Sequence, residues 1–74
     1  MKRILVVDDE MPIREMLKKY LTKKGYEVFD ADNADSAVEI VREKKPYIVL
    51  LDIRMPKTDG IEVLKRIKEI NKLN

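Results

Sequence analysis

Three short segments of the chain have the pattern of β-strands. Two are uninterrupted apolar runs: residues 4–7 read Ile-Leu-Val-Val and residues 48–51 read Ile-Val-Leu-Leu. Both are short for a helix and rich in β-branched residues, which predicts strands that are buried on both faces. The third segment, residues 26–29, reads Tyr-Glu-Val-Phe and is half polar, which favours a strand at the edge of a sheet.

Between residues 4–7 and residues 26–29, apolar residues recur at helical spacing, with basic residues on the other side of the predicted helix. Pro12 suits the first turn of this helix, and Gly25 suits a left-handed residue just beyond its end. The predicted apolar side consists of Ile13, Met16, Leu17, Tyr20 and Leu21. We expect Met16 to fill the core and Tyr20 and Tyr26 to complete its rim.

Two further helices are predicted by the same spacing. The second follows a turn at Asp32-Asn33, which can cap it, and stops at Lys45-Pro46 because proline disfavours a helical residue before it. Its apolar residues are Ala34, Ala37, Val38, Ile40 and Val41. The third starts with Asp59 and Glu62 in a capping-box-like arrangement. Its expected apolar face consists of Ile61, Leu64, Ile67 and Ile70.

The order of elements is therefore βαβαβα, with short links. Such alternation predicts an α/β fold with a parallel sheet and right-handed crossovers. The two most apolar strands should be neighbours, which places residues 26–29 on the outside and gives the strand order 2-1-3. The 74 residues are enough for one domain, so we expect a single domain over residues 1–74 with no output domain.

Both fully apolar strands run directly into acidic residues. Asp8 and Asp9 follow residues 4–7, and Asp52 follows residues 48–51. If these strands are adjacent and parallel, their carboxyl ends place the three carboxylates in one pocket, where ligands of such sheets bind. Like charges about 4 Å apart repel by roughly 4 kcal/mol at an effective dielectric near 20. Mg²⁺ is the partner that best offsets this repulsion, and an Asp beside it is a possible nucleophile toward a phosphoryl group.

Each acidic residue also has a purely structural interpretation. The segment Asp8-Asp9-Glu10 could be a solvated helix start that the helix dipole favours. An Asp at the end of a strand, such as Asp52, is often a turn former, and Asp59 is best explained as a helix cap. A phosphohydrolase that forms an aspartyl phosphate is disfavoured, because those enzymes usually place a second Asp where Arg54 stands.

Composition narrows the classes of function. With 16 basic and 14 acidic residues and no basic stripe, the chain is not expected to bind nucleic acid, and Lys65, Arg66 and Lys68 are interpreted as a solvated helix face. There is no cysteine for disulfides or thiol chemistry and no histidine to act as a base near neutral pH. No apolar run is long enough to span a membrane, and no signal peptide is recognised.

Several stretches, in this order and at this spacing, resemble the amino-terminal part of response-regulator receiver domains of two-component signalling. They are Ile4-Leu5-Val6-Val7-Asp8-Asp9-Glu10, Gly25-Tyr26-Glu27-Val28, Lys45-Pro46, Leu50-Leu51-Asp52-Ile53-Arg54-Met55-Pro56 and Asp59-Gly60. The resemblance implies a partial flavodoxin-like fold, for which the full strand order is 2-1-3-4-5. It also implies a cytoplasmic signalling module that is not an enzyme in its own right.

The resemblance implies a role for each site residue. Asp52 would be the phosphoacceptor, receiving its phosphoryl group from a histidine kinase. Asp8 and Asp9 would hold Mg²⁺, with Asp9 the more direct ligand, and the main-chain carbonyl of Arg54 would be a further ligand beside Asp52.

The match also has a limit. Complete receivers continue through two more βα units, which supply a Ser or Thr and a Lys at the phosphoryl site. Thr58 and Lys57 lie in the loop after Asp52 and do not match those positions. We expect a truncated receiver in which the strand at residues 48–51 has an open apolar edge. Such an edge predicts a homo-oligomer, most simply a dimer through that edge. The alternative function is a self-associating half-receiver that has lost phosphorylation-driven switching.

Overall fold

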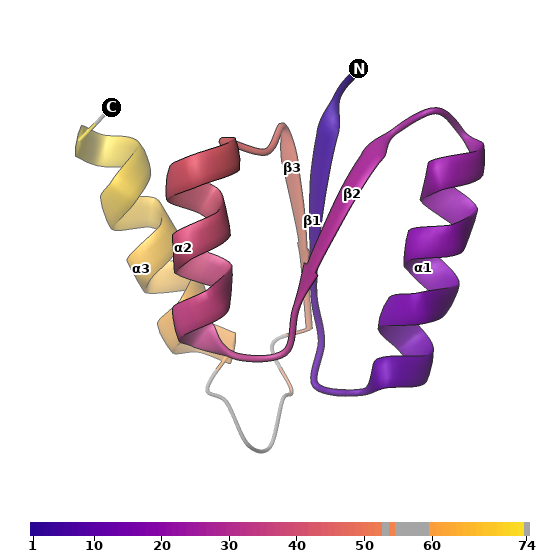
Figure 1. Ribbon diagram of the computed structural model, residues 1–74. Coiled ribbons are helices and arrows are strands. Elements are labelled where there is room, and N and C mark those ends of the chain that lie inside the picture. The colour runs from indigo at the N-terminus through magenta and orange to yellow at the C-terminus, as the bar shows by residue number, and fades with distance from the viewer. Residues whose placement is uncertain (53, 55–59, 74) are drawn as a thin grey trace.

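The computed structural model describes residues 1–52, 54 and 60–73, and the side chains of those residues as far as Ile70. The order of elements is βαβαβα, as predicted (Figure 1). The elements are β1 (Arg3–Val7), α1 (Met11–Lys23), β2 (Glu27–Ala31), α2 (Ala34–Lys44), β3 (Ile48–Leu51) and α3 (Gly60–Leu73).

The strands form a parallel sheet in the order β2-β1-β3, which confirms the predicted topology. Leu5, in the middle of β1, is in register with Phe29 on one side and Val49 on the other. Helices α2 and α3 lie on one face of the sheet and α1 lies on the opposite face (Figure 1). The parallel register brings the carboxyl ends of the three strands to the same edge of the sheet.

The core lies between the sheet and the helices α2 and α3. Leu5 and Val7 point to this face and are fully buried, and Val49 and Leu51 of β3 pack against them. The helices contribute Ala37, Val38, Val41, Val63, Ile67 and Ile70. The apolar face predicted for α2 is therefore confirmed by its three buried residues.

The predicted face of α3 is half wrong. Ile67 and Ile70 are buried as expected, but Ile61 and Leu64 are 44% and 37% exposed, and Val63 is fully buried in their place. The spacing of Val63, Ile67 and Ile70 defines a narrow stripe toward α2 and the sheet, and Ile61 and Leu64 lie beside it. The proposed cap Asp59 lies outside the described residues.

The face of the sheet under α1 is less complete. Ile4 and Val6 are buried there, but Ile48 and Leu50, their neighbours in β3, are 41% and 39% exposed. The expectation that residues 48–51 are buried on both faces is therefore wrong for one face. The reason is geometric: α1 packs over β1 and β2, and within the described residues β3 pairs only with β1.

Helix α1 contacts the sheet through fewer residues than the sequence suggested. Ile13, Leu17 and Leu21 are half-buried, and their spacing of four residues keeps them in one line along the helix. Met16 and Tyr20 are 58% and 57% exposed, so their predicted places in the core and at its rim are wrong. They lie on the flank of this line, where no second element covers them among the described residues.

The helix ends follow the local chemistry. Gly25 has a φ of +96°, its N–H donates to the Thr22 carbonyl and the N–H of Tyr26 donates to Leu21. This pair of bonds is a Schellman motif and explains the glycine after α1. Asn33 caps α2 by accepting a hydrogen bond of 2.9 Å from the N–H of Ser36. At the other end of α2, Lys45 leaves the helical region with a φ of +46°.

Candidate metal and phosphoacceptor site

Backbone hydrogen bonds hold the ends of the three strands together. The N–H of Asp52 donates to the Val7 carbonyl at 3.0 Å, which ties the end of β3 to the end of β1. The N–H of Asp8 donates to the Ala31 carbonyl at 3.1 Å, which ties the end of β1 to β2. Asp8 and Asp52 thus follow adjacent, paired strands, as the sequence predicted.

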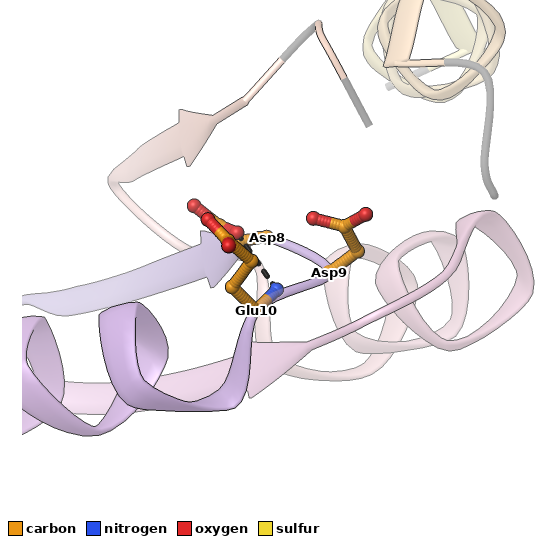
Figure 2. Close-up of side chains that lie close together, drawn as sticks. All are labelled: Asp8, Asp9 and Glu10. Carbon is orange, nitrogen blue, oxygen red and sulfur yellow. Dashed lines mark hydrogen bonds between the residues drawn. The ribbon is translucent and has the colours of Figure 1, made fainter. Parts of the chain in front are cut away.

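An acidic cluster follows β1 directly. One carboxylate oxygen from each of Asp8, Asp9 and Glu10 lies within 4.8 Å of the others. Asp8 is buried at 8% exposure, Asp9 is half-buried and Glu10 is exposed. Figure 2 shows the three side chains on the short segment between β1 and α1, with Asp8 Oδ1 accepting a hydrogen bond of 2.9 Å from the N–H of Glu10.

Asp52 is held by its own loop. Its Oδ1 accepts a hydrogen bond of 2.9 Å from the N–H of Arg54, and the Arg54 Nε lies 3.7 Å from the same oxygen. The Asp52 side chain is 25% exposed, so it is reachable from solvent, whereas the Arg54 side chain is 91% exposed. An ion pair that exposed contributes little, so the backbone bond is the main restraint on this carboxylate.

Two hollows connect Asp52 with the acidic cluster. One, of about 350 Å³, is lined by Asp9, Glu10, Asp52 and Arg54. The other, of about 450 Å³, has Asp8, Glu10, Asp52 and Arg54 on its lining together with apolar residues of β1, α1 and β3. Asp52 is outside the set of three mutually close carboxylates, but it faces the same recess. Asp8 and Asp9 therefore each share a hollow with Asp52.

Glu10 is an acidic member of the recess that was not predicted as a ligand. Its place immediately after the Asp pair was the available signal. Arg54 lies at the recess, with its side chain toward Asp52. The neighbouring loop positions Lys57, Thr58 and Asp59 lie outside the described residues.

The donor set fits a hard divalent cation. Carboxylate oxygens are the ligands that Mg²⁺ takes in proteins, usually one or two of them together with several waters. The recess offers such oxygens at different depths, from the buried Asp8 to the exposed Glu10. The chain contains no histidine or cysteine that would favour a softer metal.

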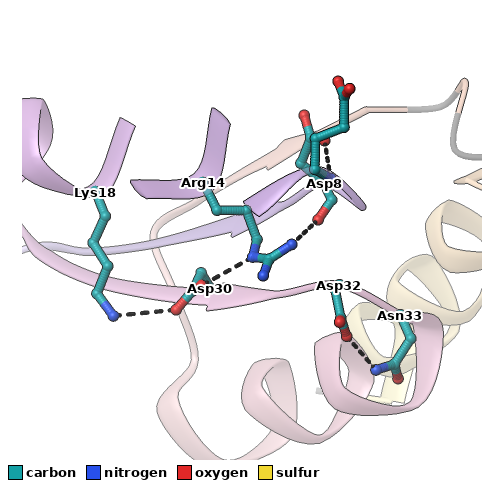
Figure 3. A network of polar contacts seen from close by, with 7 residues as sticks. Asp8, Arg14, Lys18, Asp30, Asp32 and Asn33 are labelled. Atoms are coloured by element: carbon teal, nitrogen blue, oxygen red, sulfur yellow. Dashed lines mark hydrogen bonds and ion pairs between the residues drawn. The ribbon is translucent and has the colours of Figure 1, made fainter. Parts of the chain in front are cut away.

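A polar network behind the cluster was not predicted. The Arg14 guanidinium donates to Asp30 Oδ2 at 3.1 Å through Nε and to the Asp8 carbonyl at 2.8 Å through a terminal nitrogen. Lys18 Nζ donates to Asp30 Oδ1 at 3.1 Å (Figure 3). Partial burial raises the pKa of Asp30, but the hydrogen bonds and charges of Lys18 and Arg14 outweigh it and leave the pKa lowered.

Comparison with known proteins identifies the family of this chain. The family model of the response regulator receiver domain matches residues 4–74. The chain belongs to the response-regulator receiver domain family. It is 46% identical over 70 residues to sporulation initiation phosphotransferase F of Bacillus subtilis, covering 95% of the chain and 56% of that relative. It is also 46% identical over 67 residues to the phosphate regulon transcriptional regulatory protein PhoB of Pseudomonas aeruginosa, covering 90% of the chain and 29% of that relative.

Solved receiver structures have the same fold. The response regulator TrrA of Thermotoga maritima, in complex with Mg²⁺ and BeF, superposes with a TM-score of 0.86 at 46% identity. That match covers 97% of this receiver chain and 63% of TrrA. The complex of TrrA with the histidine kinase ThkA gives a TM-score of 0.82, covering 93% and 60%. This receiver chain thus spans roughly half or less of its curated relatives, and the flavodoxin-like fold class is confirmed.

A membrane span requires a helix that is both long and apolar. Within the described residues, no helix combines these two properties.

Proposed function

We propose that this receiver domain accepts a phosphoryl group on Asp52 from a histidine kinase. One observation carries the proposal: the hydrogen bond from the Asp52 N–H to the Val7 carbonyl, which sets Asp52 at the recess that Asp8, Asp9 and Glu10 line. Asp52 also combines access to solvent with a fixed backbone. The related receiver TrrA has been solved in complex with the histidine kinase ThkA, which supports the proposed partner.

Asp8, Asp9, Asp52 and the main-chain carbonyl of Arg54 are the proposed ligands of Mg²⁺. Glu10, the third member of the acidic cluster, would hold a water molecule of the bound ion. When bound, Mg²⁺ would offset the negative charge that gathers when a phosphoryl group approaches carboxylates. The TrrA structure with Mg²⁺ and BeF supports the choice of cation.

The reaction at Asp52 is a displacement at phosphorus. A carboxylate oxygen of Asp52 attacks the phosphorus of the phosphohistidine, a P–O bond forms, and the P–N bond to the imidazole of the kinase breaks with its electron pair going to nitrogen. Asp52 Oδ1 is occupied by the Arg54 N–H, which directs the attack to Oδ2. The domain is the acceptor in this step and acts as a signalling module. We propose that the domain works in the cytoplasm.

Phosphorylation by a small-molecule donor tests the proposal without knowledge of the kinase. The chain is incubated with acetyl phosphate and Mg²⁺, and its intact mass is measured. We expect a gain of one phosphoryl group that requires Mg²⁺ and is absent in Asp52→Asn. Asp35→Asn is the control, because Asp35 is an exposed Asp on α2, away from the recess. Equal modification of wild type and Asp52→Asn would contradict the assignment.

A second candidate function is favoured by the open side of β3. Ile48 and Leu50 are exposed apolar side chains on a strand that, among the described residues, has a partner on one side only. Unpaired strand edges and apolar faces favour association. We propose that copies of this chain form a homodimer through β3.

Sedimentation measurements at micromolar concentration test the dimer. We expect the mass to rise with concentration and Leu50→Lys to shift the equilibrium toward the monomer, because a charge would enter the apolar contact. Lys65→Ala on the exposed side of α3 is the control and should leave the equilibrium unchanged. A wild type that stays monomeric throughout would end this second proposal and leave the first untouched.

A further inference from the structure

Arg14 connects the acidic cluster to the rest of the fold. Its side chain is only 13% exposed, and its guanidinium bridges two elements: Asp30 of β2 through Nε and the main-chain carbonyl of Asp8 through a terminal nitrogen. Figure 3 shows Arg14 between the two Asp residues. Two donors of one planar group in fixed directions can make such a bridge, which the single ammonium of a lysine cannot reproduce.

Asp8 is restrained at three points as a result. Its N–H donates to Ala31, its carbonyl accepts from Arg14, and its Oδ1 accepts from the N–H of Glu10. The first two bonds fix both polar groups of the Asp8 backbone. The peptide that Arg14 holds is the one that leads to Asp9, so its orientation sets the direction in which the Asp9 side chain leaves the backbone.

We propose that Arg14 is a positioning residue for the cation site, acting through the Asp8 carbonyl and held in place by Asp30. The proposal rests on the Mg²⁺ site proposed above. Groups that orient metal ligands without touching the metal typically change metal affinity by about 10–100-fold when they are removed. Arg14 occupies such a place relative to Asp8 and Asp9.

Electrostatics alone would predict tighter Mg²⁺ binding when Arg14 is replaced by a neutral residue. Arg14 is a cation beside a cation site, so deleting its charge should favour Mg²⁺ if charge were all that mattered. A positioning role predicts weaker binding in spite of the lost repulsion. The sign of the change therefore separates the two effects.

Lys18 provides a matched control, because it also donates to Asp30 but lies one helical turn beyond Arg14 along α1, farther from Asp8. Arg14→Gln and Lys18→Gln each remove a positively charged partner of the Asp30 carboxylate. The Mg²⁺ dissociation constant of the full 74-residue chain is measured by calorimetric titration. The Glu10 amide resonance is followed by NMR, because its N–H bonds to Asp8 Oδ1.

We expect Arg14→Gln to weaken Mg²⁺ binding by about 10-fold and to shift the Glu10 amide resonance. Lys18→Gln should bind within about twofold of wild type with that resonance in place. Equal or tighter binding in Arg14→Gln, with wild type binding normally, would overturn the positioning role alone. A wild type that binds no Mg²⁺ would overturn the proposed site itself, so the two failures are distinguishable.

Asp30→Asn is the second variant, for use if Arg14→Gln does not fold. It keeps the shape of the side chain and one oxygen acceptor but removes the charge that holds the guanidinium. We expect Mg²⁺ binding several-fold weaker than wild type, although Asp30 is not a ligand. An unchanged dissociation constant in a folded Asp30→Asn would overturn the proposal.

Discussion

The two faces of the sheet are built from similar residues but are covered differently. On the face of α2 and α3, Leu5 and Val7 are fully buried and Val49 and Leu51 pack against them. On the face of α1, Ile4 and Val6 are buried, yet Ile48 and Leu50 remain exposed. Two helices side by side cover the width of the sheet, whereas α1 covers only β1 and β2 (Figure 1).

The difference shows what holds α1 in place. No residue of α1 is fully buried, and its apolar contacts come from a single line of half-buried side chains. Arg14 and Lys18 add ion pairs to Asp30 in β2. The face of α2 and α3 thus depends on apolar packing, and the face of α1 depends in part on charge, next to the acidic recess.

Core truncation should separate the two faces most clearly. Leu5→Ala removes a fully buried side chain and is expected to lower the free energy of unfolding by about 3 kcal/mol. Leu50→Ala, on the open face, should cost less than about 1 kcal/mol because the side chain is 39% exposed. Urea unfolding of both variants measures the difference. Similar losses would mean that the open face is covered in solution, for example by a second copy.

The starts of α1 and α2 offer a second contrast. Asn33 caps α2 with its side chain, whereas Glu10 makes no side-chain cap for α1. Asn33→Ala is expected to cost about 1 kcal/mol, measured by urea unfolding, because the Ser36 N–H loses its acceptor. Glu10→Ala should leave stability nearly unchanged. A larger loss in Glu10→Ala than in Asn33→Ala would contradict the described helix ends.

Acid should weaken the face of α1 through Asp30. The pKa of Asp30 is lowered in the folded state, so the carboxylate stabilises the fold above its ordinary pKa of 3.8, and this contribution is lost as the pH falls through the folded value. The expected effect is the smallest of the three, because Asp30 is partly exposed. The unfolding free energy of Asp30→Asn, followed from neutral pH into this acid range, should fall less steeply than that of wild type. Parallel curves for the two proteins would contradict this contribution of Asp30.

Much of the fold follows from local patterns in the sequence. Two apolar runs of four residues predicted the strands and their adjacency, and their order 2-1-3 was confirmed. The covering of each face was harder to predict, because Ile48 and Leu50 look like core residues whether or not a helix lies over them. The spacing in α3 was compatible with two neighbouring stripes, and only packing against α2 selected Val63 over Ile61 and Leu64.

The candidate site, like the fold, could be predicted from the sequence only in part. Asp8, Asp9 and Asp52 could be predicted because each follows a strand, and strand adjacency brings them to one recess. The contacts of Arg14 could not be predicted, since its partner Asp30 is 16 residues away and on a different element. A basic residue on an amphipathic helix usually faces solvent, and only the crossing of α1 over β2 turns this one inward.

A Mg²⁺ titration followed by backbone NMR tests the central claim, that the ends of β1 and β3 form one cation site. The amides of Glu10 and Arg54 report on the two ends, since each bonds to an Asp carboxylate of the recess. We predict that both shift along one saturable curve with a common dissociation constant, and that Asp9→Asn weakens both together. Shifts confined to one strand end, or the same affinity in Asp9→Asn, would contradict a shared site.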